Sequence, residues 1–367
     1  MNKNNDIKTL FQPTFGNRPV QYIGRDGVIN QFMEGLRDPV GSRNRCTLFL
    51  GQRGMGKTAL LLELGDRAQK EDYVVARVTA HETMPQAIIE QFQLNGSKYF
   101  DDDKRKVTGV TAGALGFSFG LTFSEATERQ YGFRTKMSLI CDKLAEKGKG
   151  ALILIDEVHT SAAMREVASA YQELVGDRKN IAIAMAGLPH AVSGVLNDQA
   201  LTFLNRATKV ELGLISTNII RAYYEQVFRQ TGITFPDDIL DRAAQATRGF
   251  PYLMQLIGYY LIQYAPDEGT VSEAVMEKVE KAALSDMEDN VFKPILNPLS
   301  DNDKVFLRGL ALCGGTVTTA ELQAALGKQG PAIQVYRKRL LEAGVIEAPR
   351  RGELVFAVPY LADYLLK

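Results

Sequence analysis

The sequence has few cysteines and no long apolar run, and both absences exclude classes of protein. Its three cysteines, Cys46, Cys141 and Cys313, lie far apart in 367 residues, without the spacing of a zinc site or a disulfide framework. No stretch reaches the ~18 unbroken apolar residues of a membrane-spanning helix, and the opening MNKNNDIKTLFQ lacks the apolar core of a secretory signal. We therefore expect buried free thiols in a cytoplasmic protein with no membrane partner.

An excess of charge of either sign is also lacking, as are internal repeats and low-complexity tracts. Lys plus Arg and Asp plus Glu both number 43, so the formal net charge is zero. Such a chain has no overall field that would attract nucleic acid or acidic lipid, and any such partner requires a local patch. With 45% hydrophobic residues, the chain can form several cores, and its length favours two or three domains.

In the first half of the chain, short apolar runs alternate with segments of helical periodicity. The helical segments carry apolar residues every three to four positions, as in TALLLELGDRAQK. Strands that alternate with helices predict an α/β fold, a parallel sheet with helices on both faces. We expect this domain over residues 45–213, after a linker over 1–44. The strand-like runs are CTLFLG, YVVARVTA, ALILID and IAIAMAG.

The remaining chain predicts two further domains. Residues 214–296 read as successive helices and predict an all-α lid. Residues 297–367 read as three helices followed by a two-stranded hairpin with a basic turn, which is the order of a winged helix-turn-helix. A glycine-rich insert at 101–125 predicts a hairpin within the sheet domain, which either packs on the core or contacts a partner.

The most specific motif is GQRGMGKT at residues 51–58, which matches GxxxxGK[ST] directly after a strand and at the start of a helix. Its glycines let backbone amides turn toward an anion, Lys57 reaches the β- and γ-phosphates, and the Thr58 hydroxyl can bind Mg²⁺. The pattern is that of a P-loop, which binds ATP or ADP. The candidate phosphate-binding residues are Gly51, Gln52, Arg53, Gly54, Met55, Gly56, Lys57, Thr58 and Ala59.

Two acids end the apolar run ALILIDE on another predicted strand. Asp156 would hold Mg²⁺ together with Thr58, and Glu157 would orient or deprotonate the attacking water. A second carboxylate beside the metal acid favours hydrolysis over transfer to an acceptor. The sequence therefore predicts an ATPase.

These motifs, in this order, resemble those of the AAA+ ATPases. The chain is most similar to the group that joins the replication-initiator (origin-recognition-like) proteins with STAND-like bacterial and archaeal ATPases. The resemblance covers nearly the whole chain and implies the P-loop NTPase sheet domain, the lid and the C-terminal winged helix. Its elements are the linker YIGR, the P-loop, the acid pair, the end of the fourth strand, the segment LNR before KVELGLI, the run RGFPYLMQ and the C-terminal domain.

The resemblance also implies roles for residues outside the two motifs. Arg206 stands where such ATPases carry an arginine that reaches the γ-phosphate of the neighbouring subunit, which would require a homo-oligomer; otherwise it is a surface arginine. The linker would line the adenine pocket, unless Ile23 is a core residue and Arg25 a surface charge. The candidate nucleotide contacts implied in this way are Tyr22, Ile23, Gly24, Arg25 and Pro251.

The sequence departs from the family pattern at two places. Ala186 and Gly187 stand at the end of the fourth strand, where a polar side chain usually touches the γ-phosphate, so hydrolysis is expected to be slow. Tyr252 stands where many AAA+ proteins place an arginine toward the nucleotide. Arg248, one turn earlier, either substitutes for it or has a helix-capping or surface role.

Two hypotheses for function remain. In the first, a slow Mg²⁺-dependent oligomeric ATPase couples its nucleotide state to double-stranded DNA through the winged helix. In the second, nucleotide switches a STAND-like signalling or defence scaffold whose winged helix docks a protein partner. Residues 297–367 carry nine basic and seven acidic residues, a modest excess for DNA binding. The candidate DNA contacts are Lys328, Gln334, Arg337, Lys338, Arg339, Arg350 and Arg351.

Overall fold

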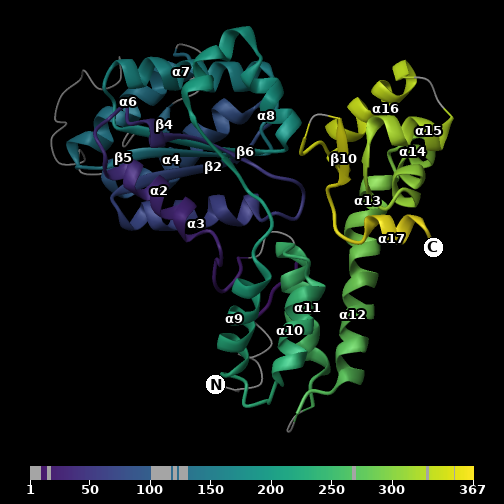
Figure 1. The fold of residues 1–367 in the computed structure, drawn as a ribbon. Coiled ribbons are helices and arrows are strands. Elements are labelled where there is room, and N and C mark those ends of the chain that lie inside the picture. The colour runs from purple at the N-terminus through teal and green to yellow at the C-terminus, as the bar shows by residue number, and fades with distance from the viewer. Residues whose placement is uncertain are drawn as a thin grey trace. The chain divides into compact units, whose positions relative to one another are not determined.

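The computed structural model describes residues 10–14, 18–100, 117–118, 122–123, 131–266, 270–327, 330–350 and 352–367. These residues form two compact units. Figure 1 colours the chain from purple at the N-terminus to yellow at the C-terminus. The sheet unit comprises residues 25–51 and 57–212. The helical unit comprises the described part of 1–24, the loop residues 52–56, and 213–367.

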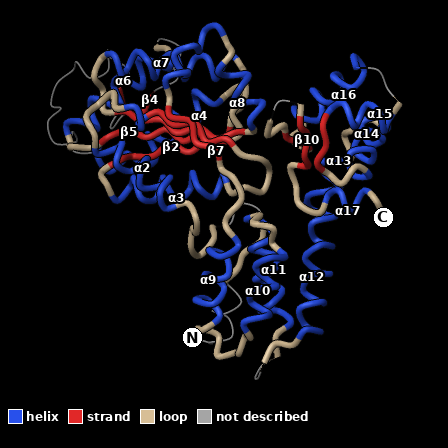
Figure 2. The backbone as a smooth tube through the Cα atoms, in the orientation of Figure 1, coloured by secondary structure: helices blue, strands red, loops and turns tan. Residues whose placement is uncertain are grey.

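The sheet unit is built on five parallel strands in the order β2-β5-β6-β1-β7. Figure 2 shows the strands in red. All residues of β6 are buried, which explains why its sequence is apolar throughout instead of alternating. Because the strands are parallel, their carboxyl ends lie at one edge of the sheet, where Leu50 pairs with Gly187. The strands are β1 (Cys46–Leu50), β2 (Tyr73–Thr79), β5 (Gly150–Asp156), β6 (Ile181–Gly187) and β7 (Thr208–Glu211).

Helices cover both faces of this sheet, as predicted for the α/β fold. Figure 2 shows α2 and α3 on one face and α6 and α7 on the other. The second layer belongs to a core cluster in which Phe92, Met137 and Val167 are fully buried. The helical elements of the sheet unit are α2 (Asp26–Arg37), η1 (Arg43–Arg45), α3 (Lys57–Lys70), α4 (Met84–Phe100), α6 (Phe133–Glu146), α7 (Ala162–Gly176), α8 (Pro189–Leu196) and η3 (Gln199–Arg206).

Within the predicted insert 101–125, two short strands are described, β3 (Phe117–Ser118) and β4 (Thr122–Phe123). They pair in antiparallel fashion, Phe117 with Phe123, and the rest of the insert lies outside the described residues. The three cysteines are free thiols. Burial is the main cause that raises the pKa of Cys46 and of Cys141 to about 12, so both are poor nucleophiles.

A buried arginine closes the end of α2. Arg45 is 4% exposed, and its guanidinium donates to the carbonyl oxygens of Gly35 at 3.1 Å, Leu36 at 2.7 Å and Asp38 at 2.6 Å. It also donates to Asn180 Oδ1 at 2.7 Å. Carbonyls in the last turn of a helix have no partner within the helix, so this side chain satisfies them and complements the helix dipole.

We expect Arg45→Met to lower the free energy of unfolding of the protein by about 3 kcal/mol, because buried carbonyls would lose their donors. Arg43→Met is the matched control, since Arg43 is an exposed arginine of the same short helix. Urea denaturation followed by circular dichroism measures both variants. Equal midpoints for the two variants would contradict the capping role.

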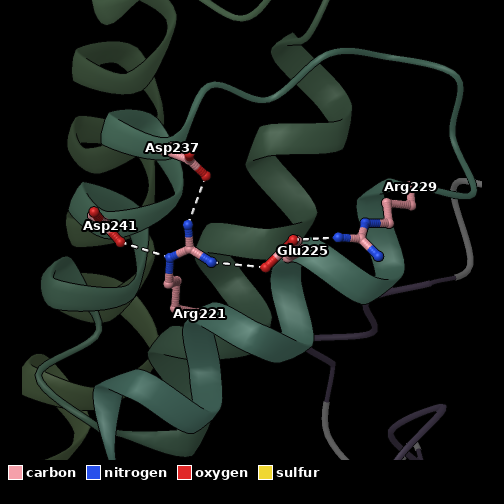
Figure 3. A network of polar contacts seen from close by, with 5 residues as sticks. All are labelled: Arg221, Glu225, Arg229, Asp237 and Asp241. Atoms are coloured by element: carbon pink, nitrogen blue, oxygen red, sulfur yellow. Dashed lines mark hydrogen bonds and ion pairs between the residues drawn. The ribbon is translucent and has the colours of Figure 1, made fainter.

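The helical unit begins with four helices of the predicted lid. α9 and α10 are joined by Arg221, whose guanidinium bonds to Asp237 at 2.6 Å, Asp241 at 2.7 Å and Glu225 at 2.7 Å (Figure 3). Glu225 also pairs with Arg229. The elements are α9 (Thr217–Phe228), α10 (Asp237–Ala246), α11 (Pro251–Tyr264) and α12 (Glu273–Met287), continued by η4 (Glu288–Phe292) and α13 (Lys293–Leu296).

The N-terminal linker is anchored on these helices by one aromatic side chain. Phe11 is 2% exposed, and its ring meets Tyr223 and Tyr224 edge-on, with centroids 5.8 and 5.7 Å apart. Gly258 on α11 makes the space, since a Cβ there would lie 2.4 Å from the Phe11 ring. These contacts place Phe11 against α9 and α11.

The C-terminal part of the helical unit contains more structure than the sequence predicts. Besides the expected hairpin, β8 pairs with β10 to give a three-stranded antiparallel sheet in the order β8-β10-β9. The three-residue run TVT, which forms β8, was too short to predict a strand from the sequence. A final helix follows β10. The elements are α14 (Asp301–Leu312), β8 (Thr316–Thr318), α15 (Thr319–Leu326), α16 (Gly330–Glu342), β9 (Ile346–Glu347), β10 (Glu353–Phe356) and α17 (Leu361–Leu365).

Candidate nucleotide-binding site

The GQRGMGKT loop follows β1 directly and leads into α3, which begins at Lys57. Gly54 and Gly56 have φ angles of +80° and +79°, which residues with side chains rarely adopt and which turn successive amides toward one side. The Lys57 ammonium donates to the Gly51 carbonyl at 2.8 Å. Backbone amides at a helix start, with a cation beside them, are suited to binding phosphate.

The structure brings the loop hydroxyl to the strand acid. Thr58 Oγ1 donates to Asp156 Oδ2 at 2.5 Å, and the other oxygen of Asp156 accepts from the Glu157 amide at 2.9 Å. The two groups come from α3 and from the end of β5, 98 residues apart in sequence. A hydroxyl and a carboxylate in this arrangement are hard oxygen ligands of the kind that Mg²⁺ prefers.

The second acid is held in a strained backbone conformation. Glu157 has a φ of +54°, an uncommon value for a residue with a side chain. The turn is fixed on both sides, because Val158 donates its amide to Ala186 O at 2.9 Å and His159 Nδ1 lies 3.1 Å from Glu157 O. The turn leaves the Glu157 side chain exposed, and strain of this kind often occurs at functional positions.

The end of β6 has no room for a polar side chain. A Cβ at Gly187 would lie 2.8 Å from Val158 Cγ2 and 3.1 Å from Val192 Cγ2. Gly187 also accepts the Gly51 amide at 3.3 Å, so the backbone at this position supports the start of the loop. Two valines and the Val158 carbonyl therefore leave no space for a side chain at position 187.

Sequence reasoning missed one residue that contacts the loop. Phe250, which is fully buried, packs its ring on Gly54, where a Cβ would lie 2.4 Å from Phe250 Cζ. The next residue, Pro251, begins α11. The only signal was the position of Phe250 in the GFPY run, which does not reveal its contact 196 positions earlier in the chain.

The linker residues are partly buried. Ile23 is 8% exposed, and Gly24 has a φ of +66° with Ile215 Cγ2 3.0 Å from where its Cβ would be. Burial lowers the pKa of the Arg25 guanidinium. Ile23 is thus a core residue and Arg25 is half-buried. Contact of these two residues with a nucleotide base stays a prediction.

The candidate arginines outside the loop differ in their surroundings. Arg206 is exposed at the end of η3, and no ion pair joins it to any residue that the structure describes. Arg248 is engaged elsewhere: its guanidinium lies 3.6 Å from the ring centroid of Tyr360 and 3.2 Å from Asp363 Oδ2. Tyr252 has a raised pKa, mainly because it is half-buried.

The predicted DNA contacts are not equally available. Gln334 and Lys338 are exposed on α16, and Arg350 is exposed between β9 and β10. Arg337 is half-buried. Arg339 instead pairs with the buried Asp303 at 2.6 Å, where it supports the capping box of α14. Lys328 and Arg351 lie outside the described residues.

Comparison with known proteins agrees with the fold. A family model described as "Type III restriction enzyme, res subunit" matches residues 18–191, and a domain of unknown function matches residues 289–365. No curated protein matches the chain. In the described residues, no helix combines the length and apolar character needed to cross a bilayer.

Among solved structures, a Walker-type ATPase of Pyrococcus abyssi aligns with a TM-score of 0.71 and 15% identity over 98% of this chain and 100% of that chain. The ORC2 protein of Aeropyrum pernix, in ADPNP-ADP complexes, aligns with a TM-score of 0.58 and 15% identity over 97% and 96%. Its ADP form gives 0.52 and 13% identity over 97% of each chain. Together, the parallel sheet and the two motifs place the chain's fold with that of Walker-type ATPases.

Proposed function

We propose that the chain binds ATP through residues 51–59 and hydrolyses it slowly. The observation that carries this proposal is the contact between Thr58 and Asp156 at 2.5 Å, which joins the P-loop to the strand acid. The loop amides and Lys57 would hold the β- and γ-phosphates. Thr58 and Asp156 would hold Mg²⁺, which supplies charge neutralisation at the transferring phosphoryl group.

Glu157 would accept a proton from the attacking water or orient it. Its side chain is exposed, and a group that acts on a water molecule must be accessible to water. With no side chain at Gly187 to hold the water or the γ-phosphate, one positioning contact is absent from this edge of the sheet. Hydrolysis depends mainly on positioning and electrostatics, so we expect turnover to be slow.

Activity as a homo-oligomer is part of this proposal. Arg206 is exposed, and among the described residues it has no ion-pair partner, so its guanidinium is available to a phosphate on a neighbouring subunit. A delocalised, permanently charged fork suits that task. The nucleotide contacts proposed for Tyr22, Ile23, Gly24, Arg25 and Pro251 rest on the family resemblance and on the partial burial of the linker.

We further propose that the C-terminal region is a winged helix that contacts double-stranded DNA. Its order of helix, strand, two helices and two strands supports this interpretation. α16 would enter a groove with Gln334, Arg337 and Lys338 facing the duplex, and Arg350 would lie near the tip of the wing. Phosphate contacts from such residues give affinity that falls with salt.

Docking of a protein partner is the second candidate for this region. Arg339 is committed to Asp303, and Lys338 lies 3.9 Å from Glu342, which reduces the basic charge that α16 offers to phosphates. In this case the protein is a nucleotide-switched scaffold. The ATP site is the same in both candidates.

The first test is nucleotide binding and Mg-ATP turnover of the purified protein, with and without duplex DNA. Lys57→Ala is expected to weaken nucleotide binding about 10- to 100-fold, since a charge-assisted contact to phosphate is lost. Lys70→Ala is the matched control, because Lys70 is exposed at the far end of the same helix. Unchanged affinity in Lys57→Ala would contradict the site.

DNA contact is tested by the salt dependence of binding. In fluorescence anisotropy with a labelled duplex, Arg337→Glu and Arg350→Glu are each expected to reduce the slope of log affinity against log salt by about one unit. Arg308→Glu, an exposed position on α14, controls for net charge. An equal effect of all three variants, or no salt-dependent binding by the wild type, would favour the scaffold candidate.

A further inference from the structure

Residues of the turn between α10 and α11 contact two segments that are far away in the sequence, the P-loop and the segment around Tyr360. The turn is fixed by Thr247, which is fully buried and whose hydroxyl donates to Ala244 O at 2.6 Å and accepts the Gly249 amide at 3.0 Å. The Phe250 amide donates to Thr247 O at 2.9 Å. Residues 247–250 therefore form a turn that three hydrogen bonds and the burial of Thr247 hold in one conformation.

On one side of the turn, Arg248 has an unexpected backbone conformation. It follows the C-cap of α10 with a φ of +46°, at a position where helices usually carry glycine. An arginine there is disfavoured by its backbone, so its side chain must contribute elsewhere. The guanidinium lies on the Tyr360 ring, 3.6 Å from the centroid, and 3.2 Å from Asp363 Oδ2.

Tyr360, the contact partner of Arg248, has a similarly uncommon backbone conformation. It too has a left-handed backbone, with a φ of +65°, and its hydroxyl donates to Ala246 O at 2.8 Å. The last residue of α10 and the first residue beyond its C-cap thus both contact Tyr360, the N-cap residue of α17. Two non-glycine residues with positive φ in direct contact indicate a conformation that the surrounding contacts impose.

On the other side of the turn, Phe250 packs on Gly54 of the P-loop. Gly249 lies between Arg248 and Phe250 in the chain. It is held in place because its carbonyl accepts the Ile215 amide at 2.8 Å. A Cβ at position 249 would also lie 2.5 Å from Ile215 O. Three consecutive residues therefore connect the P-loop to the C-terminal segment.

We propose that Arg248 and Phe250 form a relay through which nucleotide at the P-loop and the C-terminal segment Tyr360–Asp363 influence each other. Phosphate binding changes the position of Gly54 against the Phe250 ring, and the rigid turn moves Arg248 against Tyr360. Arg248 is then a latch residue for the C-terminal region and not a phosphate ligand. The nucleotide-dependent half of this proposal rests on the proposed function.

Hydrogen exchange measured by mass spectrometry on the full chain tests the latch without nucleotide. In Arg248→Gly the amides of residues 358–366 are expected to exchange about tenfold faster than in the wild type, because a cation–π contact and an ion pair are lost. Glycine suits the backbone at this position, so the substitution removes the contacts without adding strain. Tyr360→Phe, which keeps the ring, is expected to give a smaller increase.

The chain offers a matched control for this substitution. Arg178 follows the C-cap of α7 with a φ of +57°, the same position relative to its helix as Arg248, and it is exposed in the sheet unit. Arg178→Gly removes the same backbone strain and is expected to leave exchange in residues 358–366 unchanged. Equal exchange in Arg248→Gly and the wild type would overturn the latch.

Saturating Mg-ADP tests the relay. In the wild type it is expected to change exchange at residues 358–366 by about threefold or more, and in Arg248→Gly this response is lost. Phe250→Leu keeps the C-terminal protection without nucleotide but loses the response. Titration with a fluorescent ADP analogue shows separately whether nucleotide binds.

The outcomes separate the relay from the proposed function. If the analogue binds the wild type but exchange at 358–366 does not respond, the relay is wrong and the ATP site stands. If no nucleotide binds, the proposed function and the relay both fail, while the comparison of Arg248→Gly with Arg178→Gly still decides the latch. If Phe250→Leu responds as the wild type does, the path through Gly54 is wrong.

Discussion

Glu157→Gln is expected to lower Mg-ATP turnover about 100-fold or more while nucleotide affinity stays within about twofold of the wild type. General-base catalysis contributes about 10²–10⁴ in rate, and the amide keeps the shape of the side chain without its basicity. Glu157 is exposed, and among the described residues no hydrogen bond joins its side chain to the P-loop. Nucleotide binding should therefore not change. Turnover by phosphate release and affinity by calorimetry measure the two effects separately.

The control for this substitution lies at the same edge of the sheet. Glu82 is exposed three residues beyond the end of β2, and β2 pairs with β5 so that Thr79 faces Asp156. Glu82→Gln removes the same charge near the site and should leave turnover unchanged. A parallel fall of turnover in both variants would assign the effect to local charge and remove Glu157 from the proposed chemistry.

The sheet and the two motifs could be predicted because their signals are local. Four apolar runs predicted strands that the structure contains, and the carboxyl ends of parallel strands bring Asp156 to Thr58 without further information. The P-loop glycines at 54 and 56 were recognisable because only glycine readily adopts their positive φ.

What the sequence did not reveal are contacts between distant segments. Nothing near Phe250 signals that its ring lies on Gly54, and nothing near Arg339 signals that Asp303 pairs with it. A basic residue on a predicted recognition helix has the same local pattern whether it faces phosphate or a buried acid. Such assignments depend on packing, which is set by residues far apart in the chain.

Gly54→Ala is expected to abolish measurable nucleotide binding and to lower the free energy of unfolding by about 2–4 kcal/mol. The backbone has a φ of +80°, and the new Cβ would lie 2.4 Å from Phe250 Cζ. A left-handed backbone at alanine costs about 1 kcal/mol, and forcing a methyl group into packed side chains costs about 1–3 kcal/mol. Thermal or urea denaturation and analogue titration measure the two effects.

Two other glycines allow the backbone cost and the packing cost of Gly54→Ala to be measured separately. Gly148 and Gly56 have φ angles of +68° and +79°, and at each of them a Cβ would meet no atom within 4 Å. Gly148→Ala therefore reports the backbone cost alone, outside the loop, and Gly56→Ala reports it within the loop. Gly54→Ala should exceed both in its cost to stability, because of these three positions only Gly54 places the methyl group against an aromatic ring.

Combining Gly54→Ala with Phe250→Leu isolates the contact itself. The smaller side chain relieves the clash, so Gly54→Ala should cost about 1 kcal/mol less in the Phe250→Leu background than in the wild type, a coupling typical of residues in direct contact. The backbone cost remains in both backgrounds. Strictly additive effects would mean that the ring and the loop do not press on each other, and the P-loop would then have no mechanical connection to the turn that holds Arg248.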